Sequence, residues 1–429
     1  MALIIMRGLQ YFAIILALAF ATSATSATTR SSLTIESARS SLTTESTRLA
    51  EPARPFLATE SSASGSACPL GYARGSSFAA LDREHTPRAI VEPMARPLTP
   101  LQPPWTVKDD LGRTIDLPAR IERIVSIQPE ITRMIVSLGA GNRLVGIDYA
   151  IRTHDHLFGL IYPPGGRLPL VSMSENSVNL EEVFRLKPDV IFASPFERRI
   201  VESLQRRTSI PVLALASMGR FARQTEILAL VGKVLGRDAR AAELAAYFNA
   251  EIGRVREAVL NIPDNARPRV FLSFWGVLTK TPISYDPVTA AGGVNIAEKA
   301  VPDVLGAVNT LIGIEQLIRL NPDFILVHGN YPPRDRQVTV ESVRADPRLA
   351  SLKAVKAGKV RYTFGFWNWW DMAEVTVETL YLAKLFHPEK FFGSNLDREG
   401  NAIFKKFYGI DGGFSALCGI LRCGEWAHD

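Results

Sequence analysis

One sequence motif occurs twice in this chain, and it constrains the fold more than any other feature. Residues 180–191 (LEEVFRLKPDVI) and residues 314–325 (IEQLIRLNPDFI) are identical at six of twelve positions, and four more positions are apolar in both copies. Each copy has the pattern of a short helix that ends near a proline and leads into an apolar strand. The copies lie 134 residues apart, which is far too distant for a solenoid repeat. We therefore expect two similar α/β lobes.

Short apolar segments alternate with helical patterns from residue 105 onward. Strands in such an alternation form a mainly parallel sheet that helices cover on both faces. The predicted fold class is therefore α/β, with two Rossmann-like lobes that each contain a parallel sheet. The segments with strand character are 123–129, 143–148, 189–194, 210–217, 269–276, 323–329 and 359–365.

Residues 224–263 are helical in pattern almost throughout, and they lie between the two lobes. Gly236 interrupts the pattern, Asp238 is expected to cap the second helix, and Pro263 is expected to end it. A second helix of about 24 residues would be about 36 Å long at a rise of 1.5 Å per residue. A helix of this length can join one lobe to the other.

The N-terminal part of the chain differs in composition from the rest. In residues 1–27, Arg7 precedes the apolar run 9–21, which ends in Ala-Phe-Ala. This pattern is typical of a cleaved export signal, and an uncleaved anchor is the alternative, although the run is short for a membrane span. Residues 28–104 are rich in Ser, Thr, Ala, Pro and Arg, contain no lysine and lack periodicity, which predicts a disordered linker.

Composition places the remainder among ordinary globular proteins. The chain is 47% hydrophobic, which suffices for a large core, and its formal net charge of +6 comes without a Lys/Arg cluster that would indicate nucleic-acid binding. The expected organisation is a signal peptide (1–27), a linker (28–104), an N-terminal lobe (105–223), a connecting helix (224–263), a C-terminal lobe (264–392) and a C-terminal tail (393–429).

Signatures of catalysis are missing from the sequence. It has no Walker A sequence, no G-x-S-x-G, no H-E-x-x-H and no C-x-x-C. His154 and His156 could share one face of an extended loop and bind a metal, or they could form a polar loop rim, and no third ligand can be named. Cys418 and Cys423 either pair in an oxidising compartment or remain free buried thiols, because spacing alone does not establish disulfide geometry. No catalytic residue, metal site or cofactor is predicted.

Several stretches together resemble the periplasmic substrate-binding proteins of ABC importers for metal chelates, namely ferric siderophores, haem and cobalamin. Residues 109–148 are similar to the opening strand–helix–strand of that family, and residues 179–194 to its most recognisable element in the first lobe. Residues 287–297 (PVTAAGGVNIA) look like the helix start of the second lobe, and residues 380–391 like its closing helix. The resemblance covers residues 107–392. It implies two lobes joined by one long helix, with a ligand cleft between them.

The resemblance implies a binding protein without catalytic residues. We expect an exported, soluble monomer that captures an iron chelate of the siderophore type and delivers it to an inner-membrane ABC permease. Cobalamin or haem is the alternative ligand. The alternative class is a two-lobed α/β enzyme such as a sugar-nucleotide transferase, which would need a phosphate-binding loop where a strand leads into a helix. The sequence contains no such loop.

The aromatic segment FGFWNWWDM (364–372) is the main candidate for a wall of the cleft. It follows the last strand of the second lobe, where parallel α/β sheets bind ligands, and aromatic rings desolvate a bulky chelate with few rotatable bonds. Core packing is the alternative. The candidate ligand-binding residues are Trp275, Tyr285, Trp367, Trp369 and Trp370 in the second lobe, and Tyr149, Arg152 and His154 in loops of the first. Four arginines could bind carboxylates of the ligand or could face only solvent: Arg152, Arg198, Arg199 and Arg334.

Glu181 and Glu315 occupy matching positions in the two copies of the repeat, each in the first turn of its helix. A carboxylate there gains about 0.3–1 kcal/mol from the helix dipole, which needs no partner. The resemblance implies a second role, because one such glutamate on each lobe meets arginines of the permease in that family. Permease docking and local capping are both consistent with the sequence.

Overall fold

The computed structural model describes residues 105–172, 177–217, 219–274, 276–299, 309–328, 337–364, 370–425 and 427. The chain divides into a unit of residues Met1–Ser77 and a unit of residues Phe78–Asp429, and every described residue belongs to the second. The expected signal peptide and linker lie outside the described residues.

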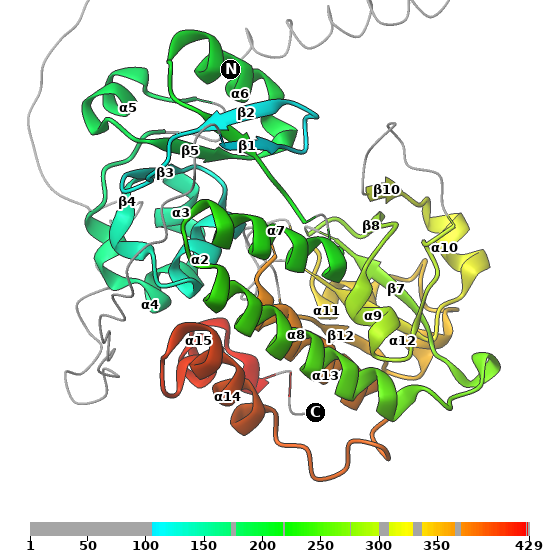
Figure 1. The fold of residues 1–429 in the computed structure, drawn as a ribbon. Helices are drawn as coiled ribbons and strands as arrows, with labels where there is room; N and C mark the ends of the chain where they lie inside the picture. Colours follow the sequence, from blue (N-terminus) through cyan, green and yellow to red (C-terminus); the bar gives the residue numbers. More distant parts are fainter. Residues whose placement is uncertain are drawn as a thin grey trace, which may run out of the picture. The chain divides into compact units, whose positions relative to one another are not determined.

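The first lobe is built on a four-stranded parallel sheet with the strand order β4-β3-β5-β6 (Figure 1). Alternate side chains of a strand point to opposite faces. Val190 and Phe192 therefore enter one core with helices α2 and α7, whereas Ile191 and Ala193 enter another with α5 and α6. The elements are β3 (Ile124–Ser126), α2 (Pro129–Ser137), β4 (Leu144–Ile147), α3 (Tyr149–His154), α4 (His156–Ile161), α5 (Leu180–Leu186), β5 (Val190–Ala193), α6 (Arg198–Arg207) and β6 (Val212–Ala214), preceded by the antiparallel hairpin β1 (Trp105–Lys108) and β2 (Thr114–Leu117).

The second lobe has the same plan, with a parallel sheet in the order β12-β11-β7-β9. A short antiparallel pair, β8 with β10, accompanies this sheet. The elements are β7 (Arg269–Ser273), β8 (Lys280–Pro282), α9 (Asp286–Ala290), β9 (Val294–Asn295), β10 (Asn309–Leu311), α10 (Ile314–Leu320), β11 (Phe324–Val327), α11 (Val340–Ala345), α12 (Lys353–Lys356) and β12 (Val360–Tyr362). The expectation of two α/β lobes with parallel sheets is confirmed.

The two copies of the repeat adopt the same local structure for the same physical reason. Helices α5 and α10 each end at a residue in the left-handed conformation, Lys187 (φ 45°) and Asn321 (φ 43°), and a proline follows each. The aspartate that both copies share then accepts a backbone hydrogen bond from the start of the neighbouring strand, Asp189 from the Arg123 amide at 2.8 Å and Asp323 from the Arg269 amide at 2.9 Å. The repeated motif therefore fixes the start of one strand beside another in each lobe.

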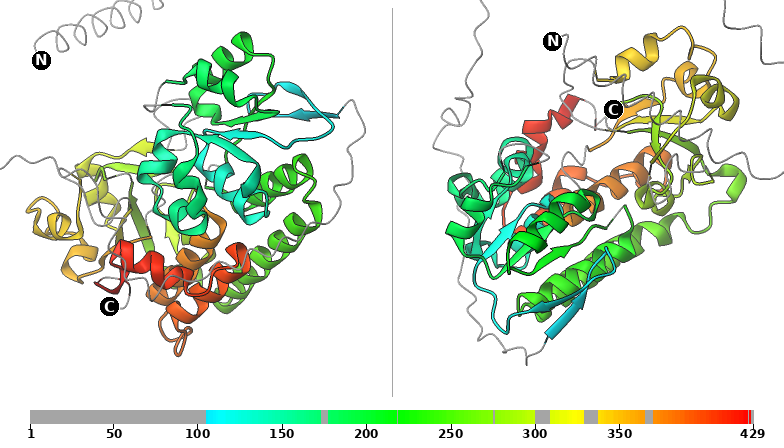
Figure 2. Two further views of the ribbon diagram at one scale, coloured as in Figure 1. Left: turned by 90° about the vertical axis from the view of Figure 1, so that its left-hand side faces the viewer. Right: turned by 90° about the horizontal axis from the view of Figure 1, so that it is seen from above.

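Two consecutive helices, α7 (Phe221–Val234) and α8 (Asp238–Val259), lead from the first lobe to the second. Figure 2 shows α8 as the long green helix, which packs against α7 and against α13 (Met372–Phe386). The break at Gly236 occurs as expected, where the glycine has a φ of 62°. The expected cap was wrong: Asp238 is the first residue of α8, Arg237 precedes it, and the helix has 22 residues and ends at Val259 rather than Pro263.

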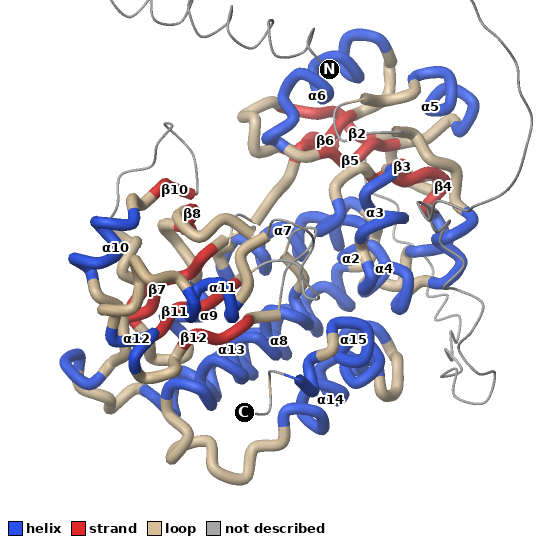
Figure 3. Tube along the Cα trace, turned by 180° about the vertical axis from the view of Figure 1, so that it is seen from behind, coloured by secondary structure: helices blue, strands red, loops and turns tan. Residues whose placement is uncertain are grey.

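The segment after residue 393 forms two helices, α14 (Leu396–Tyr408) and α15 (Gly413–Leu421), which the sequence pattern had not indicated. Helix α14 packs on α13 and on α2, and α15 packs on α14 and on α4, so the segment contacts elements of both lobes (Figure 3). Cys418 and Cys423 are both buried in this segment as free thiols.

Candidate functional site

The strands of the first lobe end at a group of buried polar side chains. Gln128 follows β3, and its Oε1 accepts a hydrogen bond from the Glu130 amide at 3.3 Å, which caps α2. Its Nε2 donates to the carbonyl oxygen of Leu215, after β6, at 3.2 Å. The carboxyl ends of parallel strands meet at one edge of the sheet, and that edge is where open α/β folds bind ligands. The polar group therefore lies at the expected place for a site.

Glu130 is the charged member of this group. It lies in the first turn of α2 and is only 1% exposed, and its Oε2 accepts a hydrogen bond from the Ser217 amide at 3.1 Å. Its Oε1 is buried with no hydrogen-bond partner among the described residues. Burial raises the pKa of Glu130 to about 7, and hydrogen bonding from Ser217 and the charge of Arg133 oppose this shift only in part.

The strands of the second lobe end at four packed rings, here called the aromatic cluster: Phe274, Tyr285, His328 and Trp370. Phe274 follows β7 and stacks on His328, which follows β11, with ring centroids 4.7 Å apart. Tyr285 contacts His328 at 5.9 Å and Trp370 at 5.3 Å between centroids. Burial lowers the pKa of His328 to about 3, so its ring is neutral at physiological pH. The cluster is therefore an uncharged and largely buried group of aromatic side chains at the sheet edge.

A buried carboxyl group on α13 holds the aromatic cluster in place. Glu378 Oε1 accepts a hydrogen bond from the Tyr285 hydroxyl at 3.5 Å, and its Oε2 accepts one from the Phe364 amide at 3.0 Å. Burial raises the pKa of Glu378 to about 8, and these two hydrogen bonds lower it only in part. Glu378 is therefore mostly protonated at neutral pH, which reduces the cost of placing it beside apolar rings.

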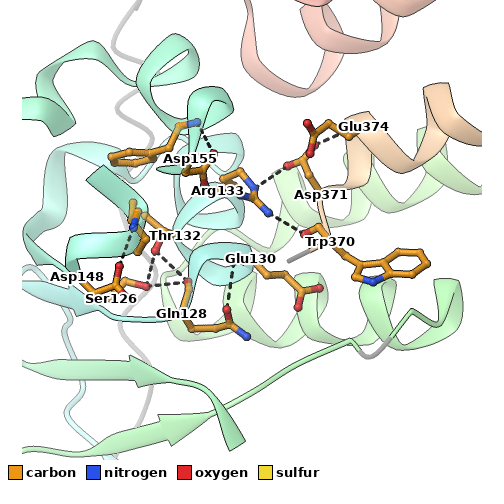
Figure 4. Close-up of polar contacts among 12 residues, drawn as sticks. Ser126, Gln128, Glu130, Thr132, Arg133, Asp148, Asp155, Trp370, Asp371 and Glu374 are labelled. Atoms are coloured by element: carbon orange, nitrogen blue, oxygen red, sulfur yellow. Dashed lines mark hydrogen bonds and ion pairs between the residues drawn. The ribbon is translucent and has the colours of Figure 1, made fainter. Parts of the chain in front are cut away.

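Segments that follow the last strands of the two sheets contact one another at Gly219. This residue follows β6 and has a φ of 76°, and a Cβ added to it would lie 2.7 Å from Cζ2 of Trp370. Only glycine suits both the backbone conformation and the close approach. A second contact joins the lobes nearby, because the Phe221 amide at the start of α7 donates to Asp286 Oδ2 at 2.8 Å. In Figure 4 the Glu130 side chain extends toward the side where the Trp370 indole lies.

A third connection between the lobes is the buried guanidinium group of Arg133 on α2 (Figure 4). Within the first lobe it donates to Asp155, and toward the second its Nε lies 3.5 Å from Asp371 Oδ2. Its Nη2 also donates to the Trp370 carbonyl oxygen at 3.3 Å. Asp371 in turn caps α13 and accepts a hydrogen bond from the Tyr408 hydroxyl of α14. Lobe one therefore helps to fix the backbone that carries the Trp370 ring.

The sequence-predicted residues of the second lobe divide into two groups. Tyr285 and Trp370 are 3% and 8% exposed and lie together in the aromatic cluster, with Trp370 also against Gly219. The other predicted tryptophans, Trp275, Trp367 and Trp369, lie outside the described residues, as does Arg334. The structure therefore brings one predicted pair together, and its role in ligand binding remains a prediction.

The predicted residues of the first lobe do not lie in a loop, because Asp148 caps a short helix there by accepting from the Ile151 amide at 2.7 Å. Tyr149, Arg152 and His154 all belong to that helix, α3. Tyr149 and His154 contact each other with centroids 5.7 Å apart, and exposed Arg152 donates to the Leu168 carbonyl oxygen. The expected extended loop was therefore wrong.

His156 begins the next helix, α4, so the two histidines do not share an extended strand face. Among the described residues, no group of three or more His, Cys, Asp or Glu side chains is arranged to hold a metal ion. Within the same ranges, no helix combines the length and apolarity that a membrane crossing requires. Arg198 and Arg199 begin α6, and both are exposed.

Glu181 and Glu315 are exposed in the first turns of α5 and α10. The side chain that caps α5 is Asn179, whose Oδ1 accepts from the Glu182 amide at 3.1 Å, and no side chain caps α10. The two glutamates are therefore repeat-related and accessible on their separate lobes.

Sequence reasoning missed Glu130, Arg133, Gly219, His328 and Glu378. A signal existed for the charged ones, because each interrupts an apolar helical pattern at a position that the helix must bury. Glu374 and Glu378 lie four residues apart in a helix whose other residues are mostly apolar. Nothing in the sequence marked Gly219, because its need for glycine comes from a tryptophan 151 residues away in the other lobe.

Comparison with known proteins identifies the class. The profile of the periplasmic binding protein family matches residues 124–364, which is more than half of the chain. The chain therefore belongs to this family, whose members are solute-binding proteins of ABC importers rather than enzymes. This confirms the resemblance read from the sequence.

Individual relatives are more distant. The molybdate-binding protein MolA of Haemophilus influenzae is 24% identical over 336 residues, which cover 70% of this chain and 90% of MolA. The solved structure of MolA bound to molybdate superimposes with a TM-score of 0.59 at 21% identity, covering 72% of this chain and 98% of MolA. CeuE of Helicobacter pylori with Ni(II) bound gives a TM-score of 0.60 at 19% identity, covering 73% and 99%. At these identities the structures establish the shared fold.

Proposed function

We propose that this protein captures a metal chelate of the iron–siderophore type at the facing strand ends and delivers it to an ABC permease. The observation that carries the proposal is the aromatic pair Tyr285–Trp370, which lies at the strand ends of one lobe and touches Gly219 at a strand end of the other. An aromatic wall supplies a large contact area with few rotatable bonds. A ligand bound at this edge would contact both lobes, which is required if the lobes close around it. Cobalamin or haem is the alternative ligand.

Molybdate is the second candidate, because the relative MolA bears that name. The charges near the site favour a chelate instead. Among the described residues here, the buried carboxyl groups of Glu130, Asp155, Asp371 and Glu374 surround the buried cation Arg133, which already binds two of them. A bare dianion would find Arg133 already paired, and these acids would repel it whenever they are ionised. A chelate encloses its metal in an organic shell and avoids that repulsion.

Equilibrium titration tests the proposal. Tryptophan fluorescence and calorimetry would follow the addition of a ferric hydroxamate, a ferric catecholate, haem, cobalamin and molybdate. We expect saturable binding of a ferric chelate, with at least about a tenfold loss of affinity in Trp370→Leu, because the ring's buried area is worth more than about 1.4 kcal/mol. Trp105→Leu, a tryptophan on β1, is the matched control. Saturation by molybdate alone would replace the chelate with the second candidate.

We further propose that residues 1–27 direct export and that Glu181 and Glu315 dock the permease. The exposure of Glu181 and Glu315 on repeat-related helices of separate lobes supports docking. The double variant Glu181→Gln, Glu315→Gln should keep its ligand affinity and lose transport and permease-stimulated ATP hydrolysis, whereas exposed Glu257→Gln should lose neither. Wild-type transport by the double variant over a range of binding-protein concentrations would leave the two glutamates as contributors to helix stability alone.

A further inference from the structure

Two buried polar side chains near the strand ends of the first lobe lack the hydrogen bonds that burial demands. Glu130 Oε1 has no partner among the described residues, and neither Oε1 nor Nε2 of Gln224 has one. Gln224 is fully buried on α7, which packs on the helix of Glu130. An unsatisfied buried polar group costs about 1–3 kcal/mol, and folded proteins rarely keep one. Glu130 Oε1 therefore has the capacity to accept a hydrogen bond from a bound ligand.

The surroundings of Glu130 indicate the chemistry of that ligand. The charged groups that face its carboxyl are Arg133, on the same helix, and Asp371, before α13. Arg133 is already engaged with Asp155, Asp371 and the Trp370 carbonyl. In its ionised form this carboxyl group can only accept hydrogen bonds, so Oε1 can take a donor from a ligand, and a bare oxyanion would be repelled.

Ser217, which donates to Glu130, lies two residues before Gly219, against which the Trp370 ring packs. The carboxyl group and the Tyr285–Trp370 pair are thus joined through one short backbone segment, and Figure 4 shows Glu130 and Trp370 on the same side of the site. A carboxylate beside aromatic rings is a combination that binds an ammonium group, because the ring faces carry negative potential.

We propose that Glu130 is a specificity-determining residue whose Oε1 accepts a hydrogen bond from a protonated amine on the transported chelate, beside Tyr285 and Trp370. This inference rests on the proposed function and narrows its ligand to chelates with a cationic donor. Glu130 then acts on the organic shell of the ligand and not on its metal.

Binding of such a ligand is linked to a proton. The pKa of Glu130 is raised by burial to about 7, so a substantial fraction of the free protein carries the proton near neutral pH. An ammonium group stabilises the carboxylate form and lowers that pKa, so binding near pH 7 releases a proton. The affinity for the amine should therefore fall as the pH drops below about 7.

A matched pair of probes tests the inference: a ferric trihydroxamate with a pendant primary amine, and the same complex with that amine acetylated. Calorimetry of the full mature protein should show about tenfold tighter binding of the amine form, with proton release for that form alone. Glu130→Gln should remove the preference, so that it binds the two forms with about equal affinity. Glu226→Gln, an exposed site on α7, is the control and should keep the preference.

Each outcome decides one claim. If wild type binds both probes equally and releases no proton, the proposed function stands and the role of Glu130 is wrong. A preference that survives in Glu130→Gln has the same consequence. If wild type binds neither probe, the hydroxamate assignment fails and the inference fails with it. Proton release is measured on the wild type, so the test does not depend on the folding of the variant.

Discussion

The two strand ends that face each other in this protein have opposite characters. The end of sheet β4-β3-β5-β6 presents Gln128, Glu130 and Ser217, which are polar and buried. The end of sheet β12-β11-β7-β9 presents the aromatic cluster, which is uncharged at neutral pH. The repeat makes the two lobes alike where strands start, through Asp189 and Asp323, and the lobes differ where strands end.

This difference distinguishes the residues that the fold requires from those that ligand binding would require. The repeated helix ends and aspartates place the strands in both lobes, so both copies keep them. The other edge is free of that constraint, and each lobe uses it differently. We infer that the aromatic end supplies contact area and that the polar end selects the ligand by its donors. Four changes of decreasing effect test this division.

Removing the guanidinium that joins the two ends should have the largest effect. Arg133→Met leaves Asp155 and Asp371 buried without their cation, and breaking a buried ion pair in this way costs about 3–5 kcal/mol. Chemical denaturation measures the loss. Arg185→Met, which breaks the exposed pair with Glu182, should leave the unfolding transition unchanged. Equal stability of Arg133→Met and wild type would show that the connection between the lobes does not depend on this residue.

Glu130, at the polar end, should make the free energy of unfolding depend on pH. The pKa of Glu130 is about 7 in the folded protein against 4.5 as its ordinary value, so the folded state holds this proton more tightly. Its contribution to stability is full below pH 4.5 and is lost as the pH rises through 7. Relative to Glu130→Gln, wild type should lose about 3 kcal/mol between pH 4.5 and 8. Parallel stability curves for the two proteins would contradict the assignment, and Glu226→Gln should follow wild type.

The contact between the ends can be tested with two glycines of nearly equal conformation. Gly219 (φ 76°) and Gly112 (φ 75°) both adopt left-handed backbone, but a Cβ at Gly112 meets nothing within 4 Å. Alanine at either position costs about 1–2 kcal/mol of backbone strain. At Gly219 it must also displace Trp370, which adds about 1–3 kcal/mol and should shift tryptophan fluorescence. Identical behaviour of the two variants would mean that the Trp370 contact is loose.

The smallest effect is expected at the aromatic end itself. Tyr285→Phe keeps the ring and removes the hydroxyl that donates to Glu378, so stability should fall by about 0.5–1.5 kcal/mol. Ligand affinity should change by less than about threefold, because area rather than hydrogen bonding is the contribution of this end. An affinity loss as large as that of Glu130→Gln would remove the distinction between the two ends. Calorimetry on both variants decides it.

The sequence predicted the lobes because their cause is local. The proline and aspartate of each repeat act within one helix–strand connection, so a short pattern reveals them. The short helix α3 was missed because its start depends on one side-chain cap, Asp148, in a segment that reads as a polar loop. The C-terminal helices α14 and α15 were missed because that segment lies outside the family resemblance.

The candidate site was only half predictable. Aromatic residues after a strand, such as Trp370, are visible in the sequence because type and position alone suggest a ligand wall. Glu130 and Arg133 are visible only once packing shows that both are buried and that one oxygen lacks a partner. Their surroundings come from α13 and from the segment after β6, far away in the chain. The proximity of these residues depends on tertiary structure, which a local sequence pattern does not record.

Hydrogen–deuterium exchange with and without ligand tests the central claim most directly, namely that both strand ends form one site. The ligand is the ferric chelate that saturates the protein in the titrations above. We predict slower exchange in two separate regions, residues 128–134 with 217–222 in the first lobe and residues 285–291 with 370–375 in the second. Protection confined to one lobe, or to surfaces away from both strand ends, would contradict the account.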